Sequence, residues 1–260
     1  MIYPTRAGGE TWAIGEDPNH DDRFITQGTL ARNSDGSWRF ENDAENAKVR
    51  MSVTTSAGYH QNQVVTDHAA LAERGYMQSP RDWKNVEITG YVRVTDVSNT
   101  GDEITWYARG GKHSNPQPFC EGVAYKGDLK FSGRVRFAKE PWHVNYYFRP
   151  GDGVPATRSI LGRWVGFKTV MYDTDAGVHL ELWVDGEGDG HWTQALATDD
   201  VGGWGSDEVY CNAPEAIPIT WGGPLATFRW DNVRKISFKH LSVREIEPND
   251  DTIFREGFDP

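Results

Sequence analysis

Six side chains between positions 109 and 147 could together move protons on an acidic substrate: Arg109, His113, Tyr125, Lys126, His143 and Tyr147. An imidazole or a phenol can take up or release a proton when its surroundings bring its pKa near the working pH. A nearby cation can neutralise a substrate carboxylate and stabilise the charge that develops when the adjacent carbon loses its proton. We therefore expect one of these histidines as base, one of these tyrosines as acid, and Arg109 or Lys126 as the cation.

These side chains lie in a basic stretch of an acidic chain. Between Ile104 and Arg149 there are eight Lys and Arg against three Asp and Glu, a net charge of +5, whereas the whole chain carries −11. A local excess of cations on an acidic protein suggests a groove for an anionic polymer. The candidate substrate-binding residues are Arg136, Lys139, Arg149, Trp106, Trp221 and Arg229. The alternative is that the charges point outward from ordinary strands and pair with acids, and that Trp221 packs in the core.

Nucleic acid is the other polyanion that a mixture of basic and aromatic residues can bind. The net charge of −11 argues against it. The sequence also lacks the glycine motifs that bind dinucleotides or phosphates. We therefore expect no nucleic acid, which leaves other anionic polymers as partners, an acidic polysaccharide among them.

The elements that must position these residues are strands. Apolar and polar residues alternate with a period of two in the runs 86–94, 104–109, 165–172, 178–184 and 236–243, the last with a bulge near His240. Turn residues separate these runs, as in all-β proteins. The segment from Asp67 to Gly75 is the exception: it predicts a short helix, with Asp67 as N-cap and Gly75 at its end. The sequence therefore predicts an all-β sandwich with one short helix.

A length of 260 residues suits one large β domain. We expect a single sandwich over 1–247, whose first part, 1–45, is irregular, followed by a polar tail or linker over 248–260. No apolar run in the sequence reaches the roughly 18 residues of a membrane-spanning helix, so we expect no membrane contact. We also expect a monomer.

Cys120 and Cys211 stand in loop-like segments, outside any CxxC motif, and predict a disulfide. In the chain-entropy treatment, a bond that closes roughly 90 residues stabilises a protein by about 4 kcal/mol. Such a bond implies an oxidising compartment, and hence a secreted or extracellular protein. The start MIYPTRAGGE, however, lacks a signal-peptide pattern, which also fits an intracellular chain or a trimmed leader. The alternative to the disulfide is two buried free thiols.

Asp185, Glu187 and Asp189 occupy positions 1, 3 and 5 of a stretch that matches the opening of a calcium loop, with Gly190 at position 6. Leu196 stands where such a loop has its bidentate acid. We expect these three acids to bind a structural Ca²⁺. The alternative is a simple hairpin turn.

The strand order and the phrase VHLELWVDG resemble the concanavalin A-like jelly roll over roughly Lys48 to Ile246. That fold serves lectins, laminarinase-type hydrolases and several polysaccharide lyases, including alginate and glucuronan lyases, and the resemblance implies a sugar groove on one of two antiparallel sheets. The hydrolase pattern ExDxxE and the lyase signatures RSELR, QIH and YFKAGxYxQ do not occur. We expect a polysaccharide lyase that cleaves a uronic-acid polymer by β-elimination, or alternatively a non-catalytic carbohydrate-binding module or lectin. A purely structural sandwich is a third possibility.

Overall fold

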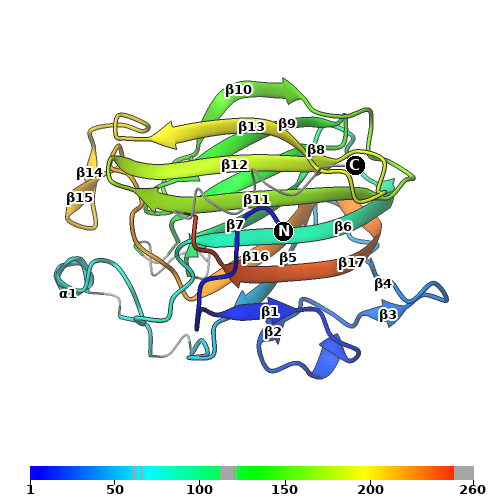
Figure 1. Ribbon diagram of the computed structural model, residues 1–260, viewed down its shortest axis with the longest axis horizontal. Coiled ribbons are helices and arrows are strands. Elements are labelled where there is room, and N and C mark those ends of the chain that lie inside the picture. The colour runs from blue at the N-terminus through cyan, green and yellow to red at the C-terminus, as the bar shows by residue number, and fades with distance from the viewer. Residues whose placement is uncertain (61–62, 66, 112–119, 121, 249–260) are drawn as a thin grey trace, which may run out of the picture.

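The computed structural model describes residues 1–60, 63–65, 67–111, 120 and 122–248. Two antiparallel sheets lie face to face in this part of the chain (Figure 1). Together with a single short α-helix among the described residues, they confirm the predicted all-β jelly roll. None of the described helices is long and apolar enough to cross a membrane. The tail predicted over 248–260 lies, apart from its first residue, outside the described residues.

The eight-stranded sheet faces the viewer in Figure 1, and its strand order is β13-β12-β11-β6-β17-β4-β3, with β1 also paired to β17. Its strands are β1 (Thr11–Ala13), β3 (Ala31–Arg32), β4 (Trp38–Glu41), β6 (Val86–Val97), β11 (Val165–Thr174), β12 (Gly177–Asp185), β13 (Thr193–Asp200) and β17 (Val233–Glu245).

The seven-stranded sheet lies behind it, in the order β10-β9-β8-β7-β16-β5-β2. Its strands are β2 (Phe24–Ile25), β5 (Lys48–Thr54), β7 (Glu103–Gly110), β8 (Ala124–Lys130), β9 (Arg134–Glu140), β10 (Tyr147–Pro155) and β16 (Leu225–Asp231). A separate pair, β14 (Val209–Tyr210) and β15 (Ala213–Pro214), and a 3₁₀ turn at Pro18–His20 complete the elements.

Strand residues alternate between the core and the outside, as the period of two predicts. On β6, Val86, Ile88 and Val92 are buried between the sheets. The predicted bulge in β17 is confirmed at His240, which has a φ of 54° and lies where the register with β6 shifts. The core is therefore the space between the two sheets.

Two glycines let the sheets approach each other closely. A Cβ atom on Gly127 of β8 would lie 2.2 Å from Thr169 Oγ1 and 2.4 Å from a methyl group of Leu182. A Cβ atom on Gly90 of β6 would lie 2.3 Å from the ring of Trp106. Any side chain at these positions would push the facing sheet away.

The predicted helix caps are confirmed. Helix α1 spans His68–Glu73, and Asp67 Oδ1 accepts a hydrogen bond from the backbone N–H of Ala70 at 2.8 Å. Gly75 follows with a φ of 64°, a left-handed conformation that glycine adopts without strain.

The predicted disulfide is also confirmed: Cys120 and Cys211 are bonded, and their Cα atoms are 5.7 Å apart. The bond ties Cys120, four residues before β8, to the turn between β14 and β15. It therefore anchors a peripheral lobe to the seven-stranded sheet.

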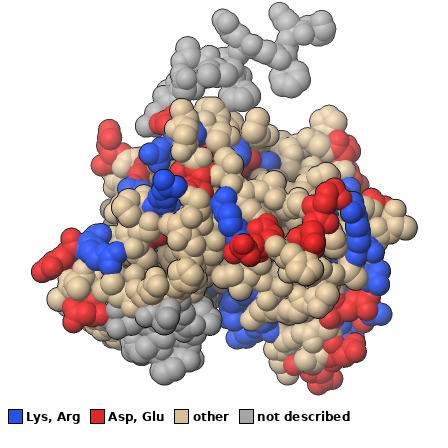
Figure 2. All heavy atoms as spheres, turned by 90° about the horizontal axis from the view of Figure 1, so that it is seen from below, with Lys and Arg blue, Asp and Glu red and all other residues tan. Residues whose placement is uncertain are grey.

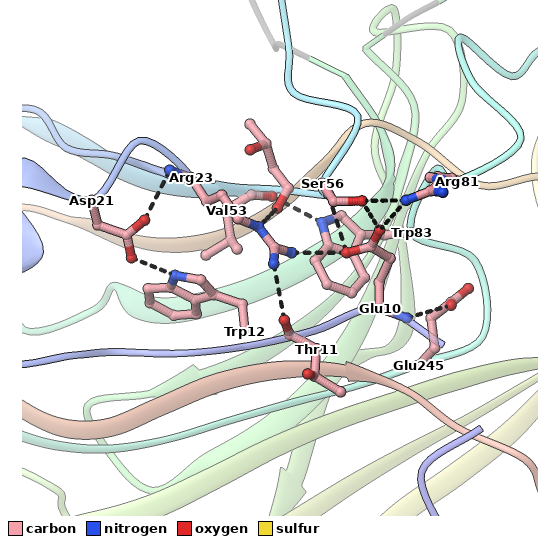
Figure 3. Close-up of polar contacts among 11 residues, drawn as sticks. Glu10, Thr11, Trp12, Asp21, Arg23, Val53, Ser56, Arg81, Trp83 and Glu245 are labelled. Carbon is pink, nitrogen blue, oxygen red and sulfur yellow. Dashed lines mark hydrogen bonds and ion pairs between the residues drawn. The ribbon is translucent and has the colours of Figure 1, made fainter. Parts of the chain in front are cut away.

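The N-terminal segment is fastened to both sheets (Figure 3). Strand β1 pairs with β17 of one sheet, and β2 pairs with β5 of the other. Between them, the carboxylate of Glu10 accepts hydrogen bonds from Arg23 at 3.1 Å and from the backbone N–H of Ser56 at 3.1 Å, and Arg81 lies 3.6 Å away. The backbone N–H of Glu10 donates to Glu245 at 2.8 Å. The first strands therefore bridge the two layers.

Candidate functional site

An open cleft of about 240 Å³ lies on the outer face of the seven-stranded sheet. The outward residues of β5, β7, β8, β9 and β16 and the segment around the start of β10 line it. The lining residues are Lys48, Glu103, Thr105, Lys126, Asp128, Ala138, Tyr146, Phe148 and Arg229. They share one face because side chains two positions apart on a strand point the same way.

Lys126 lies on the floor of the cleft and is 2% exposed. Its Nζ forms an ion pair with Glu140 and lies 3.3 Å from the hydroxyl of Tyr146. The same nitrogen is 4.9 Å and 4.4 Å from the ring centroids of Tyr107 and Tyr146. Burial disfavours the charged ammonium and lowers the pKa of Lys126 to about 8, against the opposing effect of Glu140. Such a lysine can exchange protons in mildly basic solution.

Glu140 links Lys126 to His143. One of its carboxylate oxygens lies 2.5 Å from Nδ1 of His143. Trp142 and His143 both have positive φ, 54° and 57°, so the chain turns back sharply after β9 and places the imidazole over the end of that strand. The other predicted base, His113, lies outside the described residues.

Two aromatic rings form the rim of the cleft. Tyr146 and Phe148 are 44% and 43% exposed, and their ring centroids are 6.4 Å apart with an interplanar angle of 19°. The guanidinium of Arg136 lies 3.7 Å from the Phe148 centroid. Cations beneath the rings help to hold them in place. Neighbouring large apolar side chains left half-exposed are a feature of interaction sites.

Other cations at the cleft also have acidic partners. Arg136 pairs with Asp128 at 3.0 Å and with Glu103 at 3.3 Å, and Arg229 pairs with Asp231. Burial, reinforced by the charge of Asp128, raises the pKa of Glu103 to about 7. The site is therefore a set of ion pairs beside exposed rings, and not a band of free positive charge.

The basic stretch is divided between two faces, which corrects the prediction of a single basic groove. Lys126 and Arg136 lie at the outer cleft, but Arg109 and Arg149 do not. Arg109 has a φ of 73° at a shift in the pairing of β7 with β16, so its side chain leaves the expected outward position. It is fully buried and pairs with Asp173 of the facing sheet at 2.6 Å.

Four candidates lie on the opposite side of β8, β9 and β10 from the cleft: Tyr125, Lys139, Tyr147 and Arg149. Tyr125 and Lys139 both contact the buried carboxylate of Asp200, the latter at 2.8 Å. Burial and that carboxylate hold the pKa of Tyr125 above its usual value. Tyr147 donates a hydrogen bond to Glu215 at 2.5 Å, and Arg149 lies 4.4 Å from the Trp204 ring centroid. In this arrangement the four residues bind β13 and the β14–β15 lobe to the sandwich.

Trp106 and Trp221, expected to stack on sugar rings, lie in the core. They are 2% and 6% exposed. Trp106 packs edge-on against Phe228 at 4.5 Å, and Trp221 stacks on Trp142 at 5.4 Å. Neither ring offers a face to a ligand, so the core-packing alternative describes them better.

The loop after β12 is a turn capped by Asp185. Its carboxylate is fully buried and accepts hydrogen bonds from backbone N–H groups of the loop at 2.7–3.2 Å. Glu187 pairs with Arg158 at 2.8 Å, and Asp189 pairs with His191 at 3.0 Å. In the described part of the chain, these three acids do not bring their oxygens within 4.8 Å of one another. They do not form the predicted calcium ligand set, and the hairpin alternative describes the loop.

Charges on the surface are mixed. On the face shown in Figure 2, Lys and Arg side chains lie next to Asp and Glu side chains, without a large area of either sign. This view agrees with the alternative in which the basic residues have acidic partners.

Most residues that line the cleft were not among the sequence-based candidates, including the rim residues Tyr146 and Phe148, nor was Glu140, the partner of Lys126. Alternation could have found them, because Lys126, Ala138 and Phe148 face the same side through the register of β8, β9 and β10. Tyr146 precedes β10 by one residue and continues this phase. That register, however, is a property of strand pairing, which the order of residues does not reveal.

No protein-family model and no curated protein matches this chain. Solved structures do resemble it. A carbohydrate binding module, CBM66 from Bacillus subtilis, is 10% identical, with 86% of this chain and 97% of that chain covered and a TM-score of 0.43. The exoplasmic/lumenal domain of VIP36, in a Ca²⁺/Man3GlcNAc-bound form, is 12% identical, with 89% and 88% covered and a TM-score of 0.48. A legume lectin-like domain from Entamoeba histolytica is 7% identical, with 86% and 91% covered and a TM-score of 0.45. These likenesses concern the fold alone.

Proposed function

We propose that the protein binds a polysaccharide in the cleft on the outer face of the seven-stranded sheet, in the manner of a carbohydrate-binding module. The observation that carries the proposal is the pair of half-exposed, nearly parallel rings of Tyr146 and Phe148 at the rim of that cleft. A sugar ring has apolar C–H faces and a rim of hydroxyls. It therefore suits a site that offers flat rings beside hydrogen-bonding groups.

The ion pairs beneath the rings supply those groups. Arg136 and Lys126 are donors, and Asp128 and Glu103 are acceptors. Hydrogen bonds to charged groups contribute about 1.5–3 kcal/mol each, more than those between neutral groups. Because the charged groups already hold one another in place, little side-chain freedom is lost when a ligand binds.

We also place the protein in an oxidising compartment, outside the cell or in a lumen. The Cys120–Cys211 disulfide supports this part of the proposal, because the cytosol keeps most thiols reduced.

The test is calorimetric titration with a panel of soluble polymers: β-glucan, mannan and xylan as neutral polysaccharides, and alginate and glucuronan as acidic ones. Tyr146→Ala and Phe148→Ala should each weaken binding about 2- to 10-fold, the value of a lost aromatic contact. Tyr210→Ala, on the β14–β15 lobe and not among the residues that line the cleft, is the matched control and should bind like the wild type. Failure of every polymer to bind, or unchanged affinity in both rim variants, would refute the proposal.

β-Elimination on a uronic-acid polymer is a second candidate function. One observation favours it: the Lys126 ammonium, with a pKa lowered to about 8, lies 3.3 Å from the Tyr146 hydroxyl at the open cleft. In this reaction a base takes the C5 proton, and the electron pair of the C5–H bond forms the C4=C5 double bond. The C4–O bond then breaks, and an acid protonates the leaving oxygen. Lys48, which also lines the cleft, would neutralise the substrate carboxylate.

Tyr146→Phe separates the two functions, because it keeps the ring and removes the hydroxyl. If the hydroxyl transfers a proton, this variant should bind polyuronates normally and form unsaturated product, followed by its ultraviolet absorbance, about 100-fold more slowly. Should the wild type form no unsaturated product from any polyuronate, only the binding function would remain.

A further inference from the structure

Two more cavities continue from the cleft: a middle cavity on the outer face of the seven-stranded sheet, and an end cavity among the loops just before β16. The middle cavity, of about 150 Å³, is lined among others by Tyr59, Tyr107 and Thr227. The end cavity, of about 210 Å³, is lined among others by Tyr59, Asp82 and Pro224. Tyr59 is therefore a wall of both.

The three cavities follow the direction of β16. Arg229 lines the cleft, Thr227 lines the middle cavity, and Pro224, just before the strand, lines the end cavity. Lys126 on the cleft floor contacts the Tyr107 ring of the middle cavity at 4.9 Å. The five residue steps from Arg229 to Pro224 span about 17 Å of extended chain. A ligand that reaches from the cleft to the end cavity must therefore be a chain of several sugar residues.

The end cavity contains a buried acceptor without a donor. Asp82 is 2% exposed, and its Oδ2 accepts hydrogen bonds from the backbone N–H groups of Gln78 at 2.7 Å and Ser79 at 3.1 Å. Its Oδ1 is buried and has no hydrogen-bond partner among the described residues. Buried polar atoms are nearly always partnered, so an exception points to a missing group.

The position of this carboxylate is fixed by the backbone around it. The next residue, Trp83, exchanges two backbone hydrogen bonds with Gly223, of 2.7 Å and 3.0 Å. The indole N–H of Trp83 also donates to the carbonyl of Val53 on β5 at 2.9 Å. Asp82 is thus held against the sheet before any ligand arrives, as a binding site requires.

We propose that the end cavity is a second sugar subsite, in which a hydroxyl of a neutral residue, farther along the chain held by Tyr146 and Phe148, donates to Oδ1 of Asp82. This inference rests on the proposed function and specifies its ligand: a linear oligosaccharide with an uncharged residue at this position. In the described part of the structure, no Lys or Arg forms an ion pair with Asp82. A uronate at this position would therefore meet a like charge that no direct ion pair neutralises.

The test measures how affinity depends on oligosaccharide length in the wild type and in an Asp82 variant. Oligosaccharides from disaccharide to octasaccharide are prepared from the polymer of the panel that binds best, and their affinities are measured by titration. Wild-type affinity should rise by about tenfold or more once the chain is long enough to reach the end cavity. Asp82→Asn keeps the shape and one oxygen for the Gln78 and Ser79 N–H groups, but puts an NH₂ donor where the unpartnered acceptor stood. It should weaken the long oligosaccharides about 10- to 100-fold and leave the short ones unchanged.

Two more variants test whether the effect of Asp82→Asn is specific to the end cavity. His60→Ala changes another wall of the end cavity at an exposed position and should weaken only the long oligosaccharides, by about 2- to 10-fold. Asp175→Asn, in the exposed hairpin between β11 and β12, is the matched control and should change nothing. Equal affinity for all lengths in the wild type, or equal loss at all lengths in Asp82→Asn, would overturn the subsite and leave the proposed function intact. If no polymer of the panel binds, the proposed function fails and the subsite fails with it.

Discussion

Lys126 and Glu140 are both almost completely buried and form an ion pair at the floor of the cleft. Removing two charges from water costs several kcal/mol for each ion, and their mutual attraction only roughly offsets this. The ion pair therefore serves to position the Lys126 ammonium and adds little net stability. It holds an ammonium beneath the Tyr146 ring, where water alone would not keep it.

Lys126→Met should lower the free energy of unfolding by about 3 kcal/mol, because it leaves the buried Glu140 carboxylate without its ammonium. Adding Glu140→Gln should recover part of this loss, since the stranded charge is then removed as well. Urea unfolding of both single variants and the double variant measures the coupling. Lys130→Met, at the end of β8, is a control within about 0.5 kcal/mol of the wild type. Simple additivity of the two single effects would contradict the pair as described.

Asp82 should make stability fall as the pH rises. Burial raises its pKa from 3.8 to about 6, so the folded state holds this proton more tightly than the unfolded state. The stabilisation, about 3 kcal/mol in total, is fully present below about pH 3.8 and is lost as the pH rises through about 6. In urea unfolding, Asp82→Asn should therefore gain about 2.5 kcal/mol relative to the wild type between about pH 4 and about pH 7.5. A difference that stays constant over this range would show that the carboxyl is not perturbed in this way.

At the scale of the strands, the alternation of residue types predicts which side chains build the core, and the structure confirms it for runs such as Val86, Ile88 and Val92. The candidate site was harder to predict. The alternation along β7 predicts that Arg109 points outward. The irregularity in the pairing of β7 with β16 turns its side chain inward instead. Tyr125 and Lys126 were expected in one site, although neighbours on a strand face opposite sides. The rim formed by Tyr146 and Phe148 depends on strand register, which the sequence does not encode locally.

The close approach of the two sheets at Gly127 gives a prediction for a single methyl group. Gly127→Ala should lower the free energy of unfolding by about 1–3 kcal/mol, because the new Cβ would meet Thr169 and Leu182 of the facing sheet. Gly15→Ala is the matched control, since a Cβ there meets no atom within 4 Å and the residue is exposed. Thermal and urea unfolding measure both. Equal stability of the two variants would mean that the sheets separate there without cost.

At the scale of the whole molecule, the disulfide is a connection between elements far apart in the chain. Cys120 and Cys211 are 91 residues apart, and the segment between them contains seven strands from β8 to β14. The pairing could be predicted because the chain has two cysteines and no metal-binding spacing for them. The lobe that the bond anchors could not be predicted, because it depends on where the β14–β15 pair packs against the sandwich.

The double substitution Cys120→Ala/Cys211→Ala should lower the free energy of unfolding by about 4–5 kcal/mol, the chain-entropy value for a loop of this length. Chemical denaturation of the oxidised protein, the reduced protein and the double variant measures it. Reduction should reproduce the effect of the substitution. A double variant as stable as the oxidised protein would show that the lobe is held by its other contacts, such as Tyr147 with Glu215.

The pairing of the first strand with the last has a mechanical consequence. Thr5 bridges to Ile246, and β1 continues this antiparallel pairing along β17, so both strands leave the sandwich at the same end. Tension applied between the two ends of the described chain would load these hydrogen bonds one at a time, from Thr5 toward Glu10, and not all together. The pairing of the first segment with β17 would therefore break bond by bond at low force. The separation would stop at the Glu10–Arg23 contact, where the load passes to the other sheet. The sandwich behind it would stay closed.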